Sequence, residues 1–450
     1  MTLPAAARPE PVSFVQALRF WLKLGFISFG GPAGQIAIMH SELVERRRWI
    51  SERRFLHALN YCMVLPGPEA QQLATYIGWL LHRTWGGIAA GALFVLPSLV
   101  ILIALSWVYA ALGDRPLVAA LFYGIKPAVT AIVVQAAVRI GSRTLTNRWL
   151  WTIAGTAFVA IFALQVPFPA IVLGAAIVGA IGGRIAPERF RAGAGHRSAG
   201  ASAAPALIDD DTPVPPHARV SHVRLATVLL AGIALWAVPM VLLAGWGGKQ
   251  GIYAQMGWFF TKAALLTFGG AYAVLPYVYQ GAVATYGWLT PTQMIDGLAL
   301  GETTPGPLIM VVAFVGFVGG WQSSELAAAF GPDQRFIAGA LAASLVTWFT
   351  FLPSFVFILA GGPLVETTHN EVRLTAPLTA ITAAVVGVVV NLALFFGYHV
   401  LWPQGIGARF EWPAAVIAAL AFVALLRYKR GVIEVIVACA LAGLALQRFL

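Results

Sequence analysis

Apolar runs long enough to cross a lipid bilayer dominate this sequence, and they limit the possible folds more than any other feature. A helix needs about 20 mostly apolar residues to cross about 30 Å of hydrocarbon. The chain has several runs of this length or nearly so, at 85–112, 116–140, 149–166, 168–182 and 225–243. Only 10% of its 450 residues are charged, against about 25% in soluble domains. The sequence therefore predicts an all-α polytopic membrane protein.

The net charge of +11 does not indicate a nucleic-acid partner, because cytoplasmic loops of membrane proteins collect Lys and Arg. The first apolar stretch, 12–29, contains two basic residues and lacks a small-residue cleavage site, so we expect no cleaved signal peptide. The two cysteines, Cys62 and Cys439, have no metal-binding or redox spacing. We therefore expect no metal and no cofactor, and a multi-pass protein of the cytoplasmic (inner) membrane whose surroundings are lipid.

A Pro-Gly-Pro motif opens an apolar run twice, 239 residues apart. Two prolines around a glycine end one helix and let another begin. Four features share this separation: Pro66-Gly67-Pro68 with Pro305-Gly306-Pro307, Phe29-Gly30-Gly31 with Phe268-Gly269-Gly270, Lys23 with Lys262, and Trp49 with Trp288. Beyond a polar stretch at 322–335 the separation becomes 256, as between Pro97-Ser98 and Pro353-Ser354. The chain therefore reads as two homologous halves.

These halves give a division of the chain into four segments. A stretch rich in Gly, Ala, Ser and Pro has the composition of a flexible cytoplasmic linker. The segments are a first transmembrane half at 12–183, the linker at 184–224, a connecting transmembrane helix at 225–245 and a second transmembrane half at 250–450.

The arginines predict that the second half is inverted. The loop at 40–54 holds five arginines, whereas its counterpart at 279–293 has no charged residue. The basic loop at 139–148 likewise corresponds to 395–404, which has no Lys or Arg. Because basic loops stay in the cytoplasm, equivalent loops face opposite sides. The helix at 225–245 makes the inversion, with the N-terminus inside and the C-terminus outside.

Helix breaks are the expected binding site. Irregular backbone at membrane depth is tolerated only where it is buried or lines a cavity, and inverted repeats with broken helices are a recurrent transporter plan. Each new helix after a break presents free N–H groups that suit an oxyanion. The alternative is that these motifs only turn tight hairpins. Their occurrence in symmetric pairs favours a binding site.

Charged and hydroxyl residues near the breaks complete the candidate set. Buried cations are costly and usually mark a pathway or a partner, whereas Glu69 has structural capping of its helix as a competing explanation. Residue chemistry favours a small oxyanion and does not choose among sulfate, chromate, phosphate and organic acids. The candidates for substrate binding are Lys23, Ser28, Gly30, Gly31, Gly67, Pro68, Glu69, Lys126, Lys262, Thr267, Gly269, Gly270, Glu302, Thr303, Thr304, Gly306 and Pro307.

The motifs resemble those of the chromate transporter family, long two-domain type. The similarity is carried by FISFGGPAGQIAIMH at 26–40, VLPGPEAQQLATYIGWLLH at 64–82, LTFGGAYAVLPYVYQ at 266–280, WLTPTQMIDGLALGETTPGPLI at 288–309 and FVGFVGG at 314–320. The resemblance implies secondary-active export of chromate from the cytoplasm, driven by the membrane potential or proton gradient. It also implies chromate resistance, with sulfate as competitor or counter-substrate.

Three alternatives remain open at this stage. The first is a carrier of sulfate or another oxyanion, and the second is an anion channel. The third is a membrane-embedded enzyme, for which His40, His57 and His82 lack partnered acids at a metal-binding spacing. The chain has no phosphate-binding loop for direct use of ATP. Its oligomeric state is not fixed by the sequence, and a homodimer is one arrangement left open.

Overall fold

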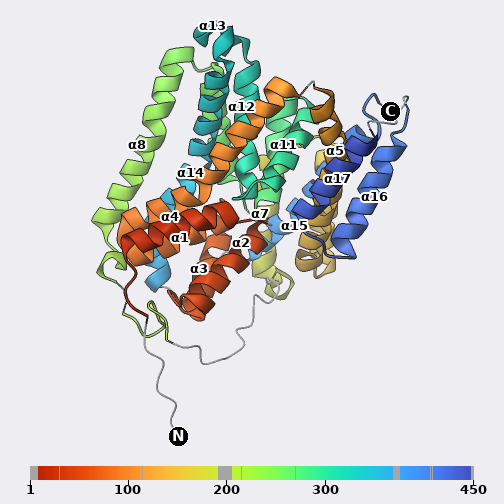
Figure 1. The fold of residues 1–450 in the computed structure, drawn as a ribbon. Coiled ribbons are helices and arrows are strands. Elements are labelled where there is room, and N and C mark those ends of the chain that lie inside the picture. The colour runs from red at the N-terminus through yellow and green to blue at the C-terminus, as the bar shows by residue number, and fades with distance from the viewer. Residues whose placement is uncertain are drawn as a thin grey trace.

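The computed structural model describes residues 9–29, 31–113, 115–190, 205–213, 215–268, 270–367, 375–405, 407 and 409–446. These residues form α-helices, short 3-10 and π-helices, and one isolated β-bridge between Ile50 and Ile208. Figure 1 shows long helices running up the molecule. The prediction of an all-α protein is confirmed over the described part of the chain.

The first half begins with short helices, which are followed by longer apolar helices. Its elements are α1 (Phe14–Ile27), α2 (Gly31–His40), η1 (Ser41–Arg46), α3 (Glu52–Val64), α4 (Glu69–Leu112), α5 (Pro116–Thr144), α6 (Arg148–Phe162), α7 (Phe168–Ile185) and η2 (Pro187–Phe190).

After the 3-10 turn η3 (Pro216–Ala218), helix α8 (His222–Gly247) connects to a second half with the same kind of helix order. This half comprises α9 (Ile252–Leu265), α10 (Ala271–Tyr279), η4 (Gln280–Thr285), α11 (Pro291–Thr303), η5 (Leu308–Met310), α12 (Val311–Gln322), α13 (Ser324–Phe330), η6 (Pro332–Gln334), α14 (Arg335–Thr367), α15 (Thr375–Leu401), α16 (Trp412–Leu426) and α17 (Val432–Leu446).

Six of the described helices are long and apolar enough to cross a membrane, namely α4, α5, α7, α8, α14 and α15. A seventh span is added if η5–α12 and α13, which bend by 68° at a short break, count as one. The predicted membrane class is therefore confirmed, although shorter apolar helices such as α6 fall below the length criterion.

Helix α4 is divided by a kink. At 44 residues a straight helix would be about 66 Å long, twice the thickness of the hydrocarbon core. The backbone leaves the helical region at His82 and at Arg83, whose φ is 57°. The part before the kink therefore forms a hairpin with α3 across the Pro-Gly-Pro break, and the part after it is a separate long helix.

The two halves are interlocked, because the long helices of one half pack against those of the other. Helix α14 packs on α4, and α15 packs on α5, α6 and α7. At the α4–α14 contact, Gly87 faces Leu359 and Gly91 faces Phe355. Residue numbers rise on one helix as they fall on the other, so α4 after its kink and α14 are antiparallel.

The repeat seen in the sequence also appears in the local structure. The π-helices η1 and η4 begin at positions 41 and 280, which are related by the same separation of 239 residues. Each is closed by an equivalent backbone hydrogen bond, from Arg47 N to Glu42 O and from Tyr286 N to Gly281 O. Equivalent stretches of the two halves therefore fold alike down to a rare helix type.

Part of the linker packs on the first half. Ile208 exchanges backbone hydrogen bonds with Trp49 and Ser51, and the Ser51 hydroxyl donates to Asp210 at 2.6 Å. Arg54 Nη2 donates to the carbonyl of Thr212 at 2.7 Å. Residues 205–213 thus pack on the arginine-rich loop, whereas 191–204 lie outside the described residues.

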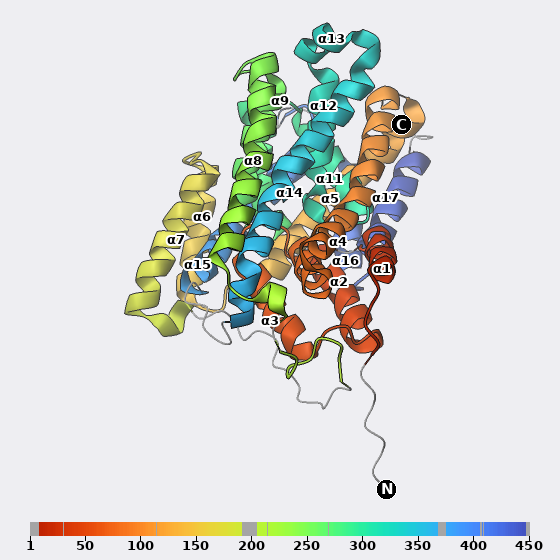
Figure 2. The same cartoon turned by 90° about the vertical axis from the view of Figure 1, so that its left-hand side faces the viewer.

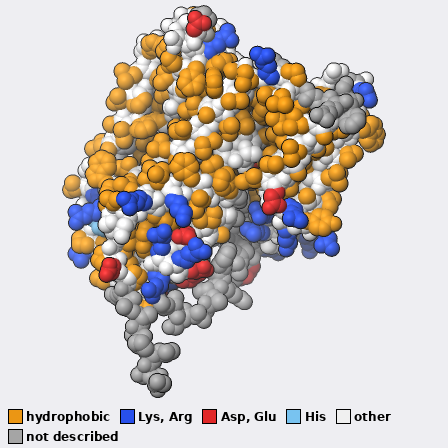
Figure 3. Space-filling view, viewed as in Figure 1, with side chains coloured by type: hydrophobic (Ala, Val, Ile, Leu, Met, Phe, Trp, Pro, Cys, Tyr) orange, Lys and Arg blue, Asp and Glu red, His pale blue; other side chains and the backbone are white. Residues whose placement is uncertain are grey.

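Charge and apolar surface separate along the molecule. In Figure 3, Lys and Arg side chains gather across the lower part of this face, and a broad hydrophobic surface lies above them. Helix α8 runs along the outside beside α14 (Figure 2). Only 6% of its apolar window is buried inside the protein, as expected for a helix surrounded by lipid.

Candidate functional site

All four predicted breaks interrupt helices at the expected residues. Helix α1 ends at Ile27 before α2 begins at Gly31, and α9 ends at Leu265 before α10 begins at Ala271. Gly31 and Gly270 have φ of 67° and 92°, values that a residue with a Cβ rarely adopts. Their neighbours Gly30 and Gly269, also predicted site residues, lie outside the described residues.

The helix breaks of the two halves contact each other through a reciprocal pair of hydrogen bonds, and we call this contact the crossing. The backbone N–H of Gly67 donates to the carbonyl of Thr267 at 2.7 Å, and that of Gly306 donates to the carbonyl of Ser28 at 2.8 Å. Each glycine of a Pro-Gly-Pro motif therefore binds the hydroxyl residue before the Phe-Gly-Gly motif of the other half. The structure brings these four predicted residues together at one crossing.

Two glutamines donate hydrogen bonds to the crossing, and no motif in the sequence predicts them. Gln35 Nε2 donates to the carbonyl of Gly306 at 2.5 Å, and Gln72 Nε2 donates to the carbonyl of Pro66 at 2.8 Å. Both side chains are buried, which in an apolar chain is itself a signal of a polar partner. They have no counterpart in the second half, where Val274 and Val311 occupy the equivalent positions.

Several buried polar atoms at the crossing have no hydrogen-bond partner among the residues that the structure describes. They are Ser28 Oγ, Ser98 Oγ and the amide oxygens Gln35 Oε1 and Gln72 Oε1. Ser98 lies against Gly306, where a Cβ would come within 2.8 Å of the serine Cβ. An unpaired buried polar group is costly, so the two hydroxyls are free to donate to a bound oxyanion or to water.

Other predicted site residues are used within their own helices. The Thr303 and Thr304 hydroxyls donate to the carbonyls of Leu300 and Gly301, at 2.9 and 3.0 Å. Pro68 and Pro307 immediately precede α4 and η5. Glu69 is the first residue of α4, where a carboxylate compensates the helix dipole.

A small pocket of 50 Å³ lies where the first break meets α5, α10 and α11. It is lined by Gly31, Pro32, Gln135, Ala136, Arg139, Ile140, Tyr272, Glu302 and Val432. The Tyr272 hydroxyl donates to the Glu302 carboxylate at 2.5 Å. The N-terminus of α2, the Arg139 guanidinium and the Gln135 amide thus surround one space, and all three can bind an anion. Arg139 was expected only as a residue of a basic loop.

Lys126 has a buried partner. Its Nζ lies 3.7 Å from Asp296 Oδ2, and the Tyr109 hydroxyl donates to the same oxygen at 2.9 Å. The Asp296 side chain is 3% exposed and its Oδ1 has no hydrogen-bond partner. These three residues come from α5, α11 and α4, so the predicted cation Lys126 joins the two halves.

The predicted lysine pair lies elsewhere. Lys23 is exposed on α1, and Lys262 is half-buried on α9 with its Nζ 5.8 Å from the Trp258 ring centre. Of the described cations, Arg139 rather than either lysine lines the small pocket. The role of the two lysines stays a prediction.

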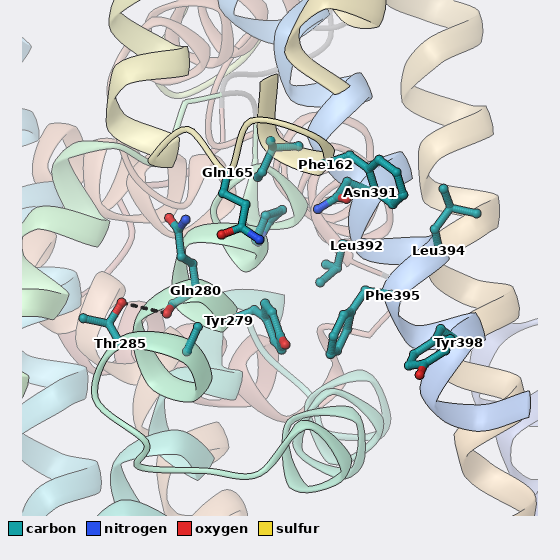
Figure 4. Close-up of a pocket in the computed structure, with 13 residues that line it drawn as sticks. Phe162, Gln165, Tyr279, Gln280, Thr285, Asn391, Leu392, Leu394, Phe395 and Tyr398 are labelled. Carbon is teal, nitrogen blue, oxygen red and sulfur yellow. Dashed lines mark hydrogen bonds between the residues drawn. The ribbon is translucent and has the colours of Figure 1, made fainter. Parts of the chain in front are cut away.

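A larger pocket of 560 Å³ opens between the α6–α7 loop, η4 and α15 (Figure 4). Amides and hydroxyls line it together with aromatic rings, and no lining residue is charged: its polar members include Gln165, Tyr279, Gln280, Thr285, Asn391 and Tyr398. Asn391 and Phe395 stand at the positions equivalent to Gln135 and Arg139 of the small pocket. The position of Arg139 in the first half is therefore taken in the second half by an uncharged residue that lines a neutral cavity.

The fold and this crossing define a multi-pass membrane protein with a polar centre built from broken helices, a plan that belongs to transporters. The chromate transporter family model matches residues 15–180 and 254–444, one segment in each half. A chromate transport protein of Pseudomonas aeruginosa is 34% identical, covering 97% of this chain and 93% of its own length. That of Cupriavidus metallidurans is 29% identical, covering 95% and 92%. No solved structure matches. The chain belongs to the chromate transporter family.

Proposed function

We propose that this protein is a secondary-active transporter that exports chromate across the cytoplasmic membrane, with sulfate as competitor or counter-substrate. The observation that carries this proposal is the crossing of helix breaks from both halves, with unpaired Ser28 and Ser98 hydroxyls inside it and an arginine pocket beside it. The relatives named above are chromate transport proteins. Chromate and sulfate are tetrahedral dianions, so the same donors suit both.

The charges of the small pocket suit a dianion best when Glu302 is protonated. The N-terminus of α2 contributes about half a positive charge, and Arg139 contributes a full one. An ionised Glu302 would cancel most of this charge, whereas a protonated Glu302 leaves about one and a half units to meet the dianion. Binding of chromate and of a proton at this pocket would therefore favour each other.

The inverted relation of the halves is also part of this proposal. It is supported by the reciprocal Gly67–Thr267 and Gly306–Ser28 hydrogen bonds and by the antiparallel contact of α4 with α14. Alternating access then follows as movement of one half against the other around the crossing.

Counterflow in proteoliposomes tests the proposal. Vesicles loaded with unlabelled chromate or sulfate should accumulate labelled chromate transiently, because a carrier exchanges substrate across the membrane. A channel would dissipate the gradient without accumulation. Counterflow of labelled sulfate but not of labelled chromate would make the protein a sulfate carrier.

A matched pair of arginine variants assigns the site. Arg139→Gln should weaken chromate binding strongly, since charge-assisted hydrogen bonds contribute about 1.5–3 kcal/mol each. Arg143→Gln, one turn further along α5 and outside the pocket, should retain transport. Equal behaviour of the two variants would remove Arg139 from the site.

A further inference from the structure

Two buried ion pairs join the halves of this protein, and they have the same composition. In the Asp296 cluster, the carboxylate of α11 meets Lys126 of α5 and the Tyr109 hydroxyl of α4. In the Glu366 cluster, the carboxylate of α14 meets Arg54 of α3 and the Tyr76 hydroxyl of α4. Each cluster therefore takes its acid from the second half, and its cation and its tyrosine from the first.

The clusters lie on opposite sides of the crossing. Ser98 of α4 and Ser354 of α14 mark the level of the crossing, because they lie against Gly306 and Gly67 respectively. Tyr109 follows Ser98 by about three helical turns, or about 16 Å, and Glu366 follows Ser354 by a similar distance of about 18 Å. Since α4 and α14 are antiparallel here, these two distances run in opposite directions.

Both ion pairs are closed without a direct hydrogen bond between cation and carboxylate, although each carboxylate accepts one from its tyrosine. The charged atoms are 3.7 Å apart between Lys126 and Asp296, and 3.6 Å apart between Arg54 and Glu366. These separations exceed hydrogen-bond length. Asp296 Oδ1 and Arg54 Nη1 are buried without a hydrogen-bond partner among the described residues. A purely structural ion pair is normally satisfied by hydrogen bonds to its remaining atoms, so this loose geometry favours pairs that separate.

We propose that the Asp296 cluster and the Glu366 cluster are the two gates of the transport cycle, each closing one access route to the crossing. The inference rests on the proposed transport function and adds the residues that alternate. In this structure both gates are closed, with each cation within 4 Å of its carboxylate. Opening one cluster parts the halves on that side and admits water to the freed charges, while the other cluster stays shut.

Cysteine accessibility tests the gates independently of substrate. A single reporter, Ser98→Cys, is placed in a chain in which the two native cysteines are replaced by serine. Its reaction with a membrane-impermeant thiol reagent is then measured from each side, in right-side-out and in inverted vesicles. Ser98 is fully buried, so labelling in the parent chain should be slow from both sides.

Releasing one gate should expose the reporter to one side only. Glu366→Gln and Asp296→Asn keep the shape of the side chain and remove its charge. Suppose that the conformer open on one side makes up about 10% or less of the parent protein. A variant that is fully open on that side should then label about tenfold faster or more. We expect Glu366→Gln to do so from one side and Asp296→Asn from the other. Faster labelling from the same side in both variants, or from neither side, would overturn the proposal.

Charge exchange separates gating from misfolding. Arg54→Glu combined with Glu366→Arg, and Lys126→Asp combined with Asp296→Lys, restore an ion pair in each cluster and should return labelling to the parent rate. Loss of folded protein in both the single and the exchanged variants would instead make the pairs structural and refute gating. If the variants show one-sided labelling but the protein fails in chromate counterflow, the proposed chromate transport is refuted and the two gates are supported.

Discussion

The crossing of the breaks depends on two glycines, and adding one methyl group to either should be costly. A Cβ on Gly67 would lie 2.3 Å from Ser354 Oγ and 2.6 Å from Gln72 Nε2, at a φ of 126°. On Gly306 it would lie 2.8 Å from Ser98 Cβ, at a φ of 106°. Strained backbone costs about 1–3 kcal/mol and overpacking about 1–3 kcal/mol. Each Gly→Ala variant should therefore lose about 2–6 kcal/mol of unfolding free energy.

Helical glycines in open surroundings provide the control. A Cβ at Gly155 or Gly174 meets nothing within 4 Å, so Ala there should be neutral or stabilise by up to about 1 kcal/mol. Unfolding free energies are measured by SDS titration from mixed micelles. Chromate counterflow is measured on the same preparations and should fail only in Gly67→Ala and Gly306→Ala. Equal stability of the Gly67 and Gly155 variants would refute the reasoning.

The remaining predictions concern charge, pH and topology. Lys23→Met and Lys262→Met should each abolish or badly weaken chromate transport in protein that is still inserted; near wild-type export by the double variant would make both lysines interfacial anchors. Burial lowers the pKa of His217 below its ordinary value of 6.5. His217 therefore binds a proton more readily when the linker is released than when the linker is packed on the protein. Docking should weaken as pH falls from about 7.5 to about 5.5, seen as faster hydrogen exchange in the linker, and His217→Gln should remove this pH dependence. Cysteines at the equivalent exposed positions Arg53 and Thr292 should label from opposite sides, and labelling of both from the cytoplasm would contradict the inverted repeat.

The local breaks could be predicted from the sequence because proline and glycine act on the backbone around them. Pro-Gly-Pro and Phe-Gly-Gly ended helices at the expected residues in both halves, and the common separation of 239 residues paired them. The kink of α4 carried no such signal. It uses a non-glycine residue, Arg83, at positive φ, which only the surrounding packing can impose.

The tertiary contacts of the site could not be predicted, because they join residues whose spacing follows no period. No local sequence pattern indicates that Gly67 forms a hydrogen bond with Thr267, or that Lys126 pairs with Asp296, which is distant in sequence. Gln35 and Gln72 have no counterpart in the second half, so the repeat does not indicate them. Arg139 belongs to a cluster of arginines that is typical of a loop, whereas the structure places it on α5.

The exposed helix α8 has a consequence for how the protein is made. Since so little of it is buried against the rest of the protein, its main effect in the proposed inverted arrangement is on the side from which the second half enters the bilayer. In that arrangement, joining the halves without α8 would present α9 to the insertion machinery from the same side as α1. The reciprocal hydrogen bonds at the crossing could then not form, because both copies of the break would point the same way. Under the proposed inversion, a nearly unpacked helix thus decides whether two well-packed halves can assemble at all.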